Sequence, residues 1–170
     1  MQFGINWVLG HIRFLADLGI DLSANANYLL EEAVRAFADK EVMEILIERG
    51  IDIACSNHLA INIAASMGSV RMVEILRDLG ADISSNSDLP LALATKYNRI
   101  EVVRYLISHG ADPMALDNYP MKTAVYNSYL ELKNLLLELG ADPEPNLIPY
   151  AEAPMTLVWP DSYSDEGGDW

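Results

Sequence analysis

Apolar positions along the chain recur in blocks with the spacing of amphipathic helices. In four segments, apolar residues stand three and four positions apart, which places them on one face of a helix. These positions are Val42, Ile45 and Leu46; Met72, Ile75 and Leu76; Val102, Tyr105 and Leu106; and Leu132, Leu135 and Leu136. A shorter apolar helix is predicted before each of them, with Leu30, Ala33 and Val34; Ile61, Ala64 and Ala65; Leu91 and Ala94; and Met121 and Ala124. The pattern therefore predicts pairs of helices.

A triplet of glycine, a small or β-branched residue and aspartate follows each longer helix. The triplets begin at Gly19, Gly50, Gly80, Gly110 and Gly140, in steps of 31, 30, 30 and 30 residues. Glycine suits a left-handed helix cap, because a side chain would be strained there. Each unit then reads as helix, tight turn, helix and extended loop. Neither helix of a unit buries its apolar face alone, so the units are expected to stack into a solenoid.

These repeats resemble the ankyrin repeat, whose motif runs T-P-L-H-x-A-A, G-H, V-V-x-x-L-L and G-A-D. The match is strongest in residues 89–94 (Leu-Pro-Leu-Ala-Leu-Ala) and from Val102 to Asp112. The resemblance implies an all-α ankyrin-repeat solenoid over residues 1–142, with a capping helix and loop in residues 1–26 and four repeats in residues 27–142. The 30-residue period is similar to that of compact repeats in viral and bacterial ankyrin proteins.

Several positions depart from the ankyrin motif. The family's threonine is replaced by Leu59, Leu89 and Tyr119, and its histidine by Asn62, Ala92 and Lys122. The loss of the threonine–histidine hydrogen bonding implies shorter hairpins and a looser scaffold. The glycine between the paired helices is kept only as Gly68, with Asn98 and Ser128 in the later repeats.

Residues 143–170 form an acidic C-terminal tail of different composition. They contain five of the eight prolines, six acidic residues, no basic residue and four aromatic residues. Such a composition is typical of a solvated tail. Against that interpretation, residues 155–159 (Met-Thr-Leu-Val-Trp) have the composition of a strand. We expect residues 147–159 to dock on the last repeat and residues 161–170 to contact a partner.

The charge of the chain restricts the class of partner. Twenty-five acidic residues against eleven basic residues leave a formal net charge of −14. Such a protein repels the phosphates of nucleic acids and anionic membrane surfaces, and attracts basic proteins. We therefore expect a protein partner that is basic or has a basic cleft, and no binding of nucleic acid or membrane.

The sequence favours a cytoplasmic protein, in the host cytoplasm if it is viral. One cysteine, Cys55, cannot form a disulfide within the chain and favours a reducing compartment. No stretch approaches the ~18–20 apolar residues of a membrane span. Residues 1–19 have no basic region of the kind that begins a signal peptide. Their apolar residues are better suited to a solenoid cap than to a membrane surface.

Catalytic and metal-binding patterns are weak. His11, His58 and His109 occupy different repeat positions without ligand spacing, so we expect no metal and no cofactor. Cys55 and His58 lie three residues apart in a loop, with no third group to orient them, and we assign no catalytic residue. Residues 161–167 fail as a calcium loop, because the glycine comes one position late.

In the absence of a catalytic or metal-binding pattern, the candidate functional region is the surface formed by the loops and by the first helix of each repeat. Tyrosines among small polar residues are typical of surfaces that bind proteins. The candidate partner-binding residues of the repeats are Asn57, His58, Asn86, Asp88, Lys96, Tyr97, Asn118, Tyr119, Lys122 and Tyr126. Those of the tail are Asp161, Asp165, Glu166, Asp169 and Trp170. Tyr97 and Tyr126 have an alternative role, since they could simply cover the turn between two helices.

Together these features predict a non-catalytic protein–protein interaction module. The acidic charge favours an inhibitor or adaptor that occludes a basic site, as a viral or phage counter-defence protein or as an immunity protein that neutralises a toxin. No small-molecule substrate is expected. Two alternatives stay open: an enzyme with a site made of carboxylates from the concave face and the tail, and a structural spacer.

Overall fold

The computed structural model describes residues 10, 14, 18, 26–53 and 55–143, and these residues contain eight helices. The helices are α2 (Ala26–Arg35), α3 (Lys40–Glu48), α4 (Cys55–Met67), α5 (Val70–Asp78), α6 (Ser85–Lys96), α7 (Ile100–Ser108), α8 (Ala115–Tyr126) and α9 (Leu130–Glu138). No strand occurs in this part of the chain. The prediction of an all-α solenoid is thus confirmed. The predicted N-terminal cap and acidic tail fall mostly or wholly outside the described residues.

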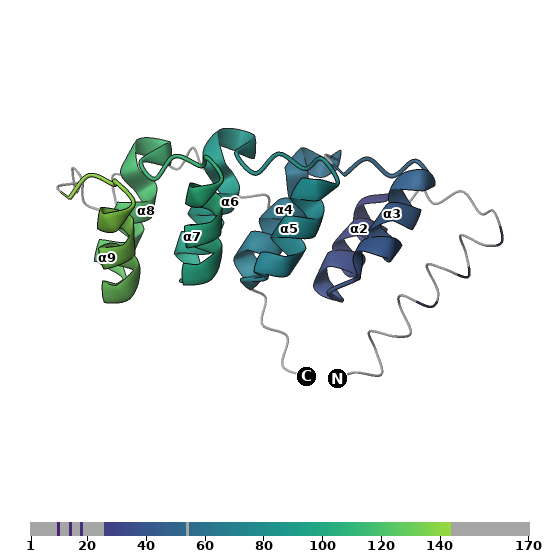
Figure 1. Cartoon of the computed structure of the whole chain (residues 1–170), viewed down its shortest axis with the longest axis horizontal. Helices are drawn as coiled ribbons and strands as arrows, with labels where there is room; N and C mark the ends of the chain where they lie inside the picture. The colour runs from purple at the N-terminus through teal and green to yellow at the C-terminus, as the bar shows by residue number, and fades with distance from the viewer. Residues whose placement is uncertain (1–9, 11–13, 15–17, 19–25, 54, 144–170) are drawn as a thin grey trace.

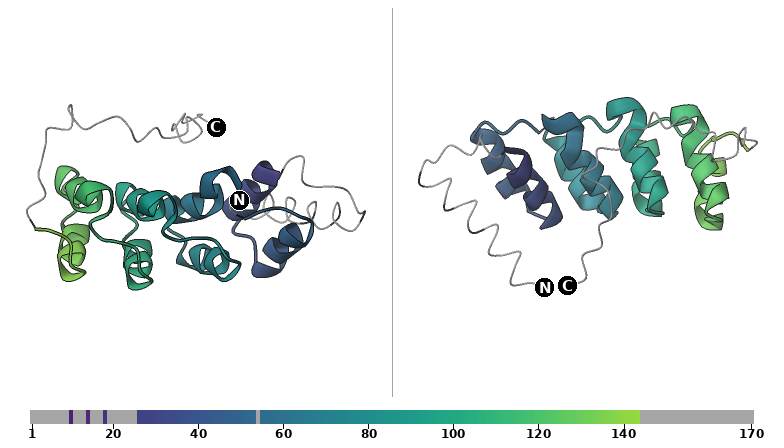
Figure 2. Two further views of the ribbon diagram at one scale, coloured as in Figure 1. Left: turned by 90° about the horizontal axis from the view of Figure 1, so that it is seen from above. Right: turned by 180° about the vertical axis from the view of Figure 1, so that it is seen from behind.

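The helices form two layers, as the view from above in Figure 2 shows. One layer contains α2, α4, α6 and α8, which pack side by side and are called the inner helices below. The other layer contains α3, α5, α7 and α9, the outer helices, each packed on the inner helix that precedes it. The loops that connect successive repeats all run along the same edge of the stack (Figure 1). We call this the loop edge, and the opposite edge, with the tight turns between paired helices, the turn edge.

The core consists of equivalent residues from successive repeats. On the inner helices, Leu30, Ile61, Leu91 and Met121 are each at most 2% exposed. On the outer helices, Leu46, Leu76, Leu106 and Leu136 are completely buried. The predicted apolar positions lie in this core, except that Ile45 and Tyr105 are only half-buried. Each repeat therefore buries the apolar face that its helical pattern predicts.

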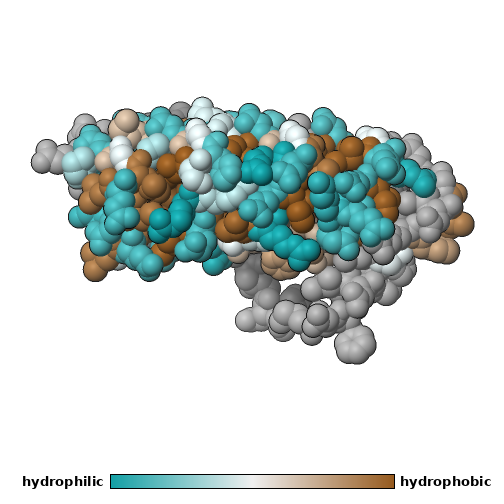
Figure 3. All heavy atoms as spheres, in the orientation of Figure 1, coloured by the Kyte–Doolittle hydropathy of each residue, from teal (hydrophilic) through white to brown (hydrophobic). Residues whose placement is uncertain are grey.

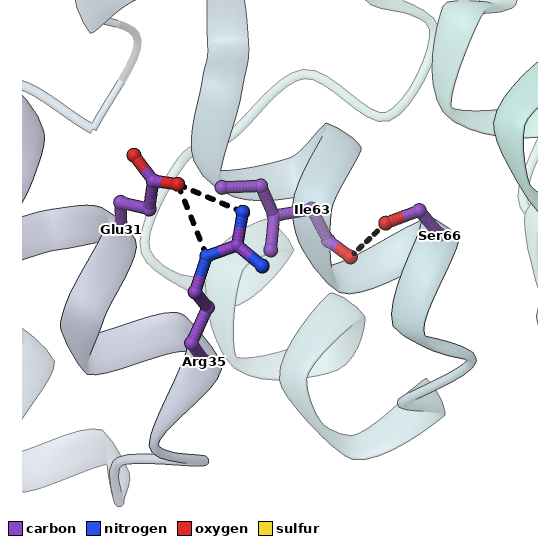
Figure 4. Close-up of polar contacts among 4 residues, drawn as sticks. All are labelled: Glu31, Arg35, Ile63 and Ser66. Atoms are coloured by element: carbon purple, nitrogen blue, oxygen red, sulfur yellow. Dashed lines mark hydrogen bonds and ion pairs between the residues drawn. The ribbon is translucent and has the colours of Figure 1, made fainter. Parts of the chain in front are cut away.

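Polar side chains near the turn edge stabilise the ends of individual helices. The N-caps Asp39 and Ser69 accept hydrogen bonds from the amides of Val42 and Met72, at 3.0 and 3.2 Å. Such caps satisfy amides that have no partner within the helix. On α2, Arg35 donates to Glu31 at 2.8 Å, and on α4 the hydroxyl of Ser66 donates to the carbonyl of Ile63 (Figure 4).

Gly68 lies in a tight turn and has a left-handed backbone, with φ +84°. A Cβ atom at this position would lie 2.8 Å from Cδ of Arg99, whose Nε donates to the carbonyl oxygen of Ser66 at 2.8 Å. Arg99 thus crosses from the third repeat to the end of α4, and glycine leaves room for it. Phe37, Asn98 and Ser128 have positive φ at the equivalent positions of the other repeats.

Replacing Ser128 with glycine is expected to raise the free energy of unfolding by about 0.5–1 kcal/mol, because Ser128 holds φ at 58° without the freedom of glycine. Chemical denaturation of the two proteins measures the difference. Asn98→Gly is the control, since asparagine tolerates the left-handed region better, and we expect a smaller gain there. If Ser128→Gly instead lowered the free energy of unfolding, the serine side chain would stabilise the protein by more than its left-handed backbone destabilises it.

Candidate protein-binding surface

Left-handed turns build the loop edge. In α6 the residues 86–88 have φ of 53–63°, and in α8 the residues 116–118 have φ of 53–59°. The right-handed part of each helix begins after this turn, so that Pro90 and Pro120 lie in a first helical turn, where proline is tolerated. His58 has φ 62° at the equivalent position in α4. The turns thus lie between each loop and the right-handed part of the inner helix.

The aspartates of the Gly-x-Asp triplets shape these loops. Oδ1 of Asp82 accepts a hydrogen bond from the amide of Ser84, and Oδ1 of Asp112 accepts one from the amide of Met114, both at 2.9 Å. Aspartate stabilises turns in this way by bonding to the backbone two residues on. Both carboxylates remain exposed, so their negative charges face solvent at the edge of the stack.

Two contacts at the loop edge join the start of an inner helix to the Gly-x-Asp loop that follows the next outer helix. Oδ2 of Asp88 accepts from the amide of Asp112 at 3.4 Å, and Nδ2 of Asn118 donates to the carbonyl of Asp142 at 3.3 Å. Asn118 is only 8% exposed. The prediction that Asn118 is displayed on the surface is therefore wrong, because this polar side chain packs against the loop that follows α9.

The loop edge is rich in negative charge. Its described residues, 50–53, 55–58, 80–88, 110–118 and 140–143, include six aspartates and no lysine or arginine. The six are Asp52, Asp82, Asp88, Asp112, Asp117 and Asp142. At the turn edge, residues 35–39, 66–70, 96–100 and 126–130 contain three basic residues and one acidic residue. The charge is thus segregated between the two edges, which the net charge of the chain did not reveal.

The structure divides the predicted binding residues between these two edges. His58, Asn86, Asp88 and Tyr119 are at least partly exposed at the loop edge, although Nδ1 of His58 and Oδ1 of Asp88 are buried. The side chain of Asn57 and the whole tail, including Asp161, Asp165, Glu166, Asp169 and Trp170, lie outside what the structure describes.

The remaining predicted residues are not part of the loop edge. Lys96, Tyr97 and Tyr126 lie at the turn edge, at the other end of the inner helices. There Nζ of Lys96 lies 5.3 Å from the ring centre of Tyr97, so these two residues contact each other. Lys122 is half-buried in α8, and its Nζ forms a 2.6 Å ion pair with Asp117.

A cluster on the outer helices links the second and third repeats. The guanidinium of Arg77 lies 5.5 Å from the ring centre of Tyr105, whose ring stacks on His109 at 4.1 Å. Arg77 also donates to Asp78 and so lowers the pKa of that carboxyl, while burial raises the pKa of the Tyr105 phenol. His109 caps the end of α7, with Nδ1 2.8 Å from the carbonyl oxygen of Tyr105. This arrangement stabilises the stack.

Metal-binding groups and membrane-spanning helices were both sought among the described residues. Nowhere in the described ranges do three or more histidine, cysteine, aspartate or glutamate side chains form a group that could hold a metal ion. None of the helices described is long and apolar enough to cross a membrane. A prominent surface feature of the repeats is the row of aspartates, four of which our sequence analysis used only as markers of the repeat.

Comparison with known proteins agrees with the architecture. The family model described as ankyrin repeats (3 copies) matches residues 30–117 and, in a second overlapping match, residues 84–146. A search of curated proteins finds no match to the chain. Ankyrin repeats are generally non-enzymatic modules for protein–protein interaction. Because the matches cover more than half of the sequence and agree with the stacked helix pairs, the chain belongs to the ankyrin-repeat family.

Proposed function

We propose that this ankyrin-repeat chain is an acidic inhibitor or adaptor that covers a basic site on a partner protein. The observation that carries the proposal is the row of six aspartates along the loop edge, of which Asp117 forms an ion pair with Lys122 of α8. Complementary charge on two surfaces speeds their encounter and disfavours wrong partners. A basic surface of the partner is the complement of this edge.

The spacing of the aspartates supports recognition of an extended surface. Asp52, Asp82, Asp112 and Asp142 are all exposed and occupy the same position in successive repeats. Helices that pack side by side are about 8–10 Å apart, so the four carboxylates form a row of about 25–30 Å. A row of that length suits a partner with several lysines or arginines, rather than a small cation.

The acidic end of the tail adds to this function. Residues 161–170 contain four of the six acidic residues of the tail, together with Trp170. Charged residues steer the encounter, and a buried aromatic residue holds the complex. We propose that Asp161, Asp165, Glu166, Asp169 and Trp170 contact the partner beside the loop edge, in the cytoplasm of the cell where the protein acts.

Affinity capture from cell extract tests this function, with the full chain and a chain lacking residues 161–170 as baits. Mass spectrometry is expected to identify a basic partner that is recovered more weakly by the shortened bait. The association rate constant of the purified pair should fall steeply with added salt, because salt screens charges at a distance. A rate that does not depend on salt would contradict recognition by charge.

Duplex DNA serves as the control ligand, and we expect it not to bind at moderate salt.

A further inference from the structure

The outward side of α9 differs from the same side of the earlier outer helices. Met43, Val73 and Val103 are completely buried in α3, α5 and α7, whereas the equivalent residue in α9 is Lys133. Likewise, Val70 and Ile100 are half-buried. Their equivalent, Leu130, is 71% exposed. Among the described helices, none packs on this side of α9, which explains the exposure.

This side of α9 forms a small surface of mixed character, which we call the end face and define by Leu130, Lys133 and Leu137. The three residues are spaced by three and four positions and so share one face of the helix. Leu137 is 37% exposed, and no described residue forms an ion pair with Lys133. Apolar atoms are visible at this end of the stack in Figure 3. The end face thus offers two exposed leucines on either side of a positive charge.

We propose that residues 147–159 of this chain dock on the end face. This segment contains seven large apolar residues, one acidic residue and no basic residue. Leucine and tryptophan side chains match Leu130 and Leu137, and the carboxylate of Glu152 matches Lys133. Glu152 gives the segment a net negative charge, which is complementary to Lys133 and not to the acidic loop edge.

The length of the chain permits this contact. The segment begins nine residues after Glu138, the last residue of α9. Thirteen extended residues span up to ~43 Å, while the nine residues of α9 measure ~14 Å. Because the segment is tethered next to the end face, its effective concentration is in the millimolar range, so docking needs little intrinsic affinity. A terminal repeat also needs a cover that is not another repeat.

Tryptophan fluorescence tests the proposal independently of any partner. In a protein with Trp7→Phe and Trp170→Phe, Trp159 is the remaining tryptophan. We expect its emission to be blue-shifted and weakly quenched by acrylamide in the native protein. Leu130→Asp should move the emission toward that of the denatured chain and raise the quenching constant at least twofold. An acidic residue is favourable in the first turn of α9, so the helix itself should remain.

Two further variants make the result decisive. Lys133→Glu reverses the charge of the end face and should expose Trp159 as Leu130→Asp does. Tyr28→Asp changes an exposed residue at the other end of the stack and should leave Trp159 unchanged. Light scattering should show a monomer. The proposal would be overturned if Trp159 in the native protein emitted like Trp159 in the denatured chain, or if neither α9 variant changed its emission. A dimer whose dissociation exposes Trp159 would also overturn it.

Discussion

Replacing Leu106 with alanine is expected to lower the free energy of unfolding by about 2–5 kcal/mol. Leu106 is completely buried in α7 and belongs to the same core cluster as Leu76 and Leu136. Alanine removes three carbon atoms and leaves a cavity that a stack of rigid helices fills only in part. Urea denaturation followed by circular dichroism at 222 nm measures the loss, and Leu76→Ala should cost a similar amount.

Arg104→Ala is the matched control, since it changes an exposed residue of the same helix and should alter stability by no more than about 0.5 kcal/mol. Near-neutral effects of both leucine substitutions would contradict the assignment of these positions to the core. A native spectrum dominated by β-structure would contradict the fold itself.

The helix pairs and their register could be predicted because two independent signals repeat together. The spacing of apolar residues indicates the helices, and the Gly-x-Asp triplets mark where each outer helix ends. Leu76 and Leu106 were placed in the core on this basis, and both are completely buried. The same pattern of apolar residues and triplets occurs in four repeats, so an uncertain helix position in one repeat can be fixed by comparison with the others.

The left-handed turns at the start of the inner helices α6 and α8 could not be predicted. Leu116 has φ 53°, a conformation that leucine rarely adopts, and nothing in its local sequence indicates it. The turn is imposed by the short connection between Asp112 and Pro120, which must bring the chain into the first turn of an inner helix. Tertiary geometry overrides local preference at these positions.

The candidate binding surface was predicted only in part, for two physical reasons. Polar loop residues are usually exposed, but Asn118 donates to the carbonyl of Asp142, in the loop after α9, and is buried. The sequence analysis also assigned polar residues of one repeat to a single surface. Asp88 and Tyr97 are nine residues apart along the helix, or ~13 Å, and therefore lie at opposite edges of the stack. The acidic row could have been found from the sequence, because residues with the same position in every repeat lie along one edge of a solenoid.

Removing three charges from the loop edge is expected to slow association with the partner at least tenfold at low salt. The variant is Asp52→Asn, Asp82→Asn and Asp112→Asn, three exposed positions of the acidic row. Asparagine keeps an oxygen that can accept the hydrogen bonds from the amides of Ser84 and Met114, so the loops should keep their shape. The effect is electrostatic and should shrink as added salt screens the charges.

The control variant carries Glu41→Gln, Glu44→Gln and Glu101→Gln, which remove three charges from exposed positions on the outer helices. Both variants have the same net charge, so a difference between them reports the place of the charges and not their number. The direct measurement is the association rate constant of each variant with the captured partner, determined by stopped-flow across a range of salt concentrations. We predict that the loop-edge variant associates at least tenfold more slowly than the parent protein at low salt, while the control variant stays within about threefold. Equal rates for the two variants would contradict the claim that the loop edge recognises the partner.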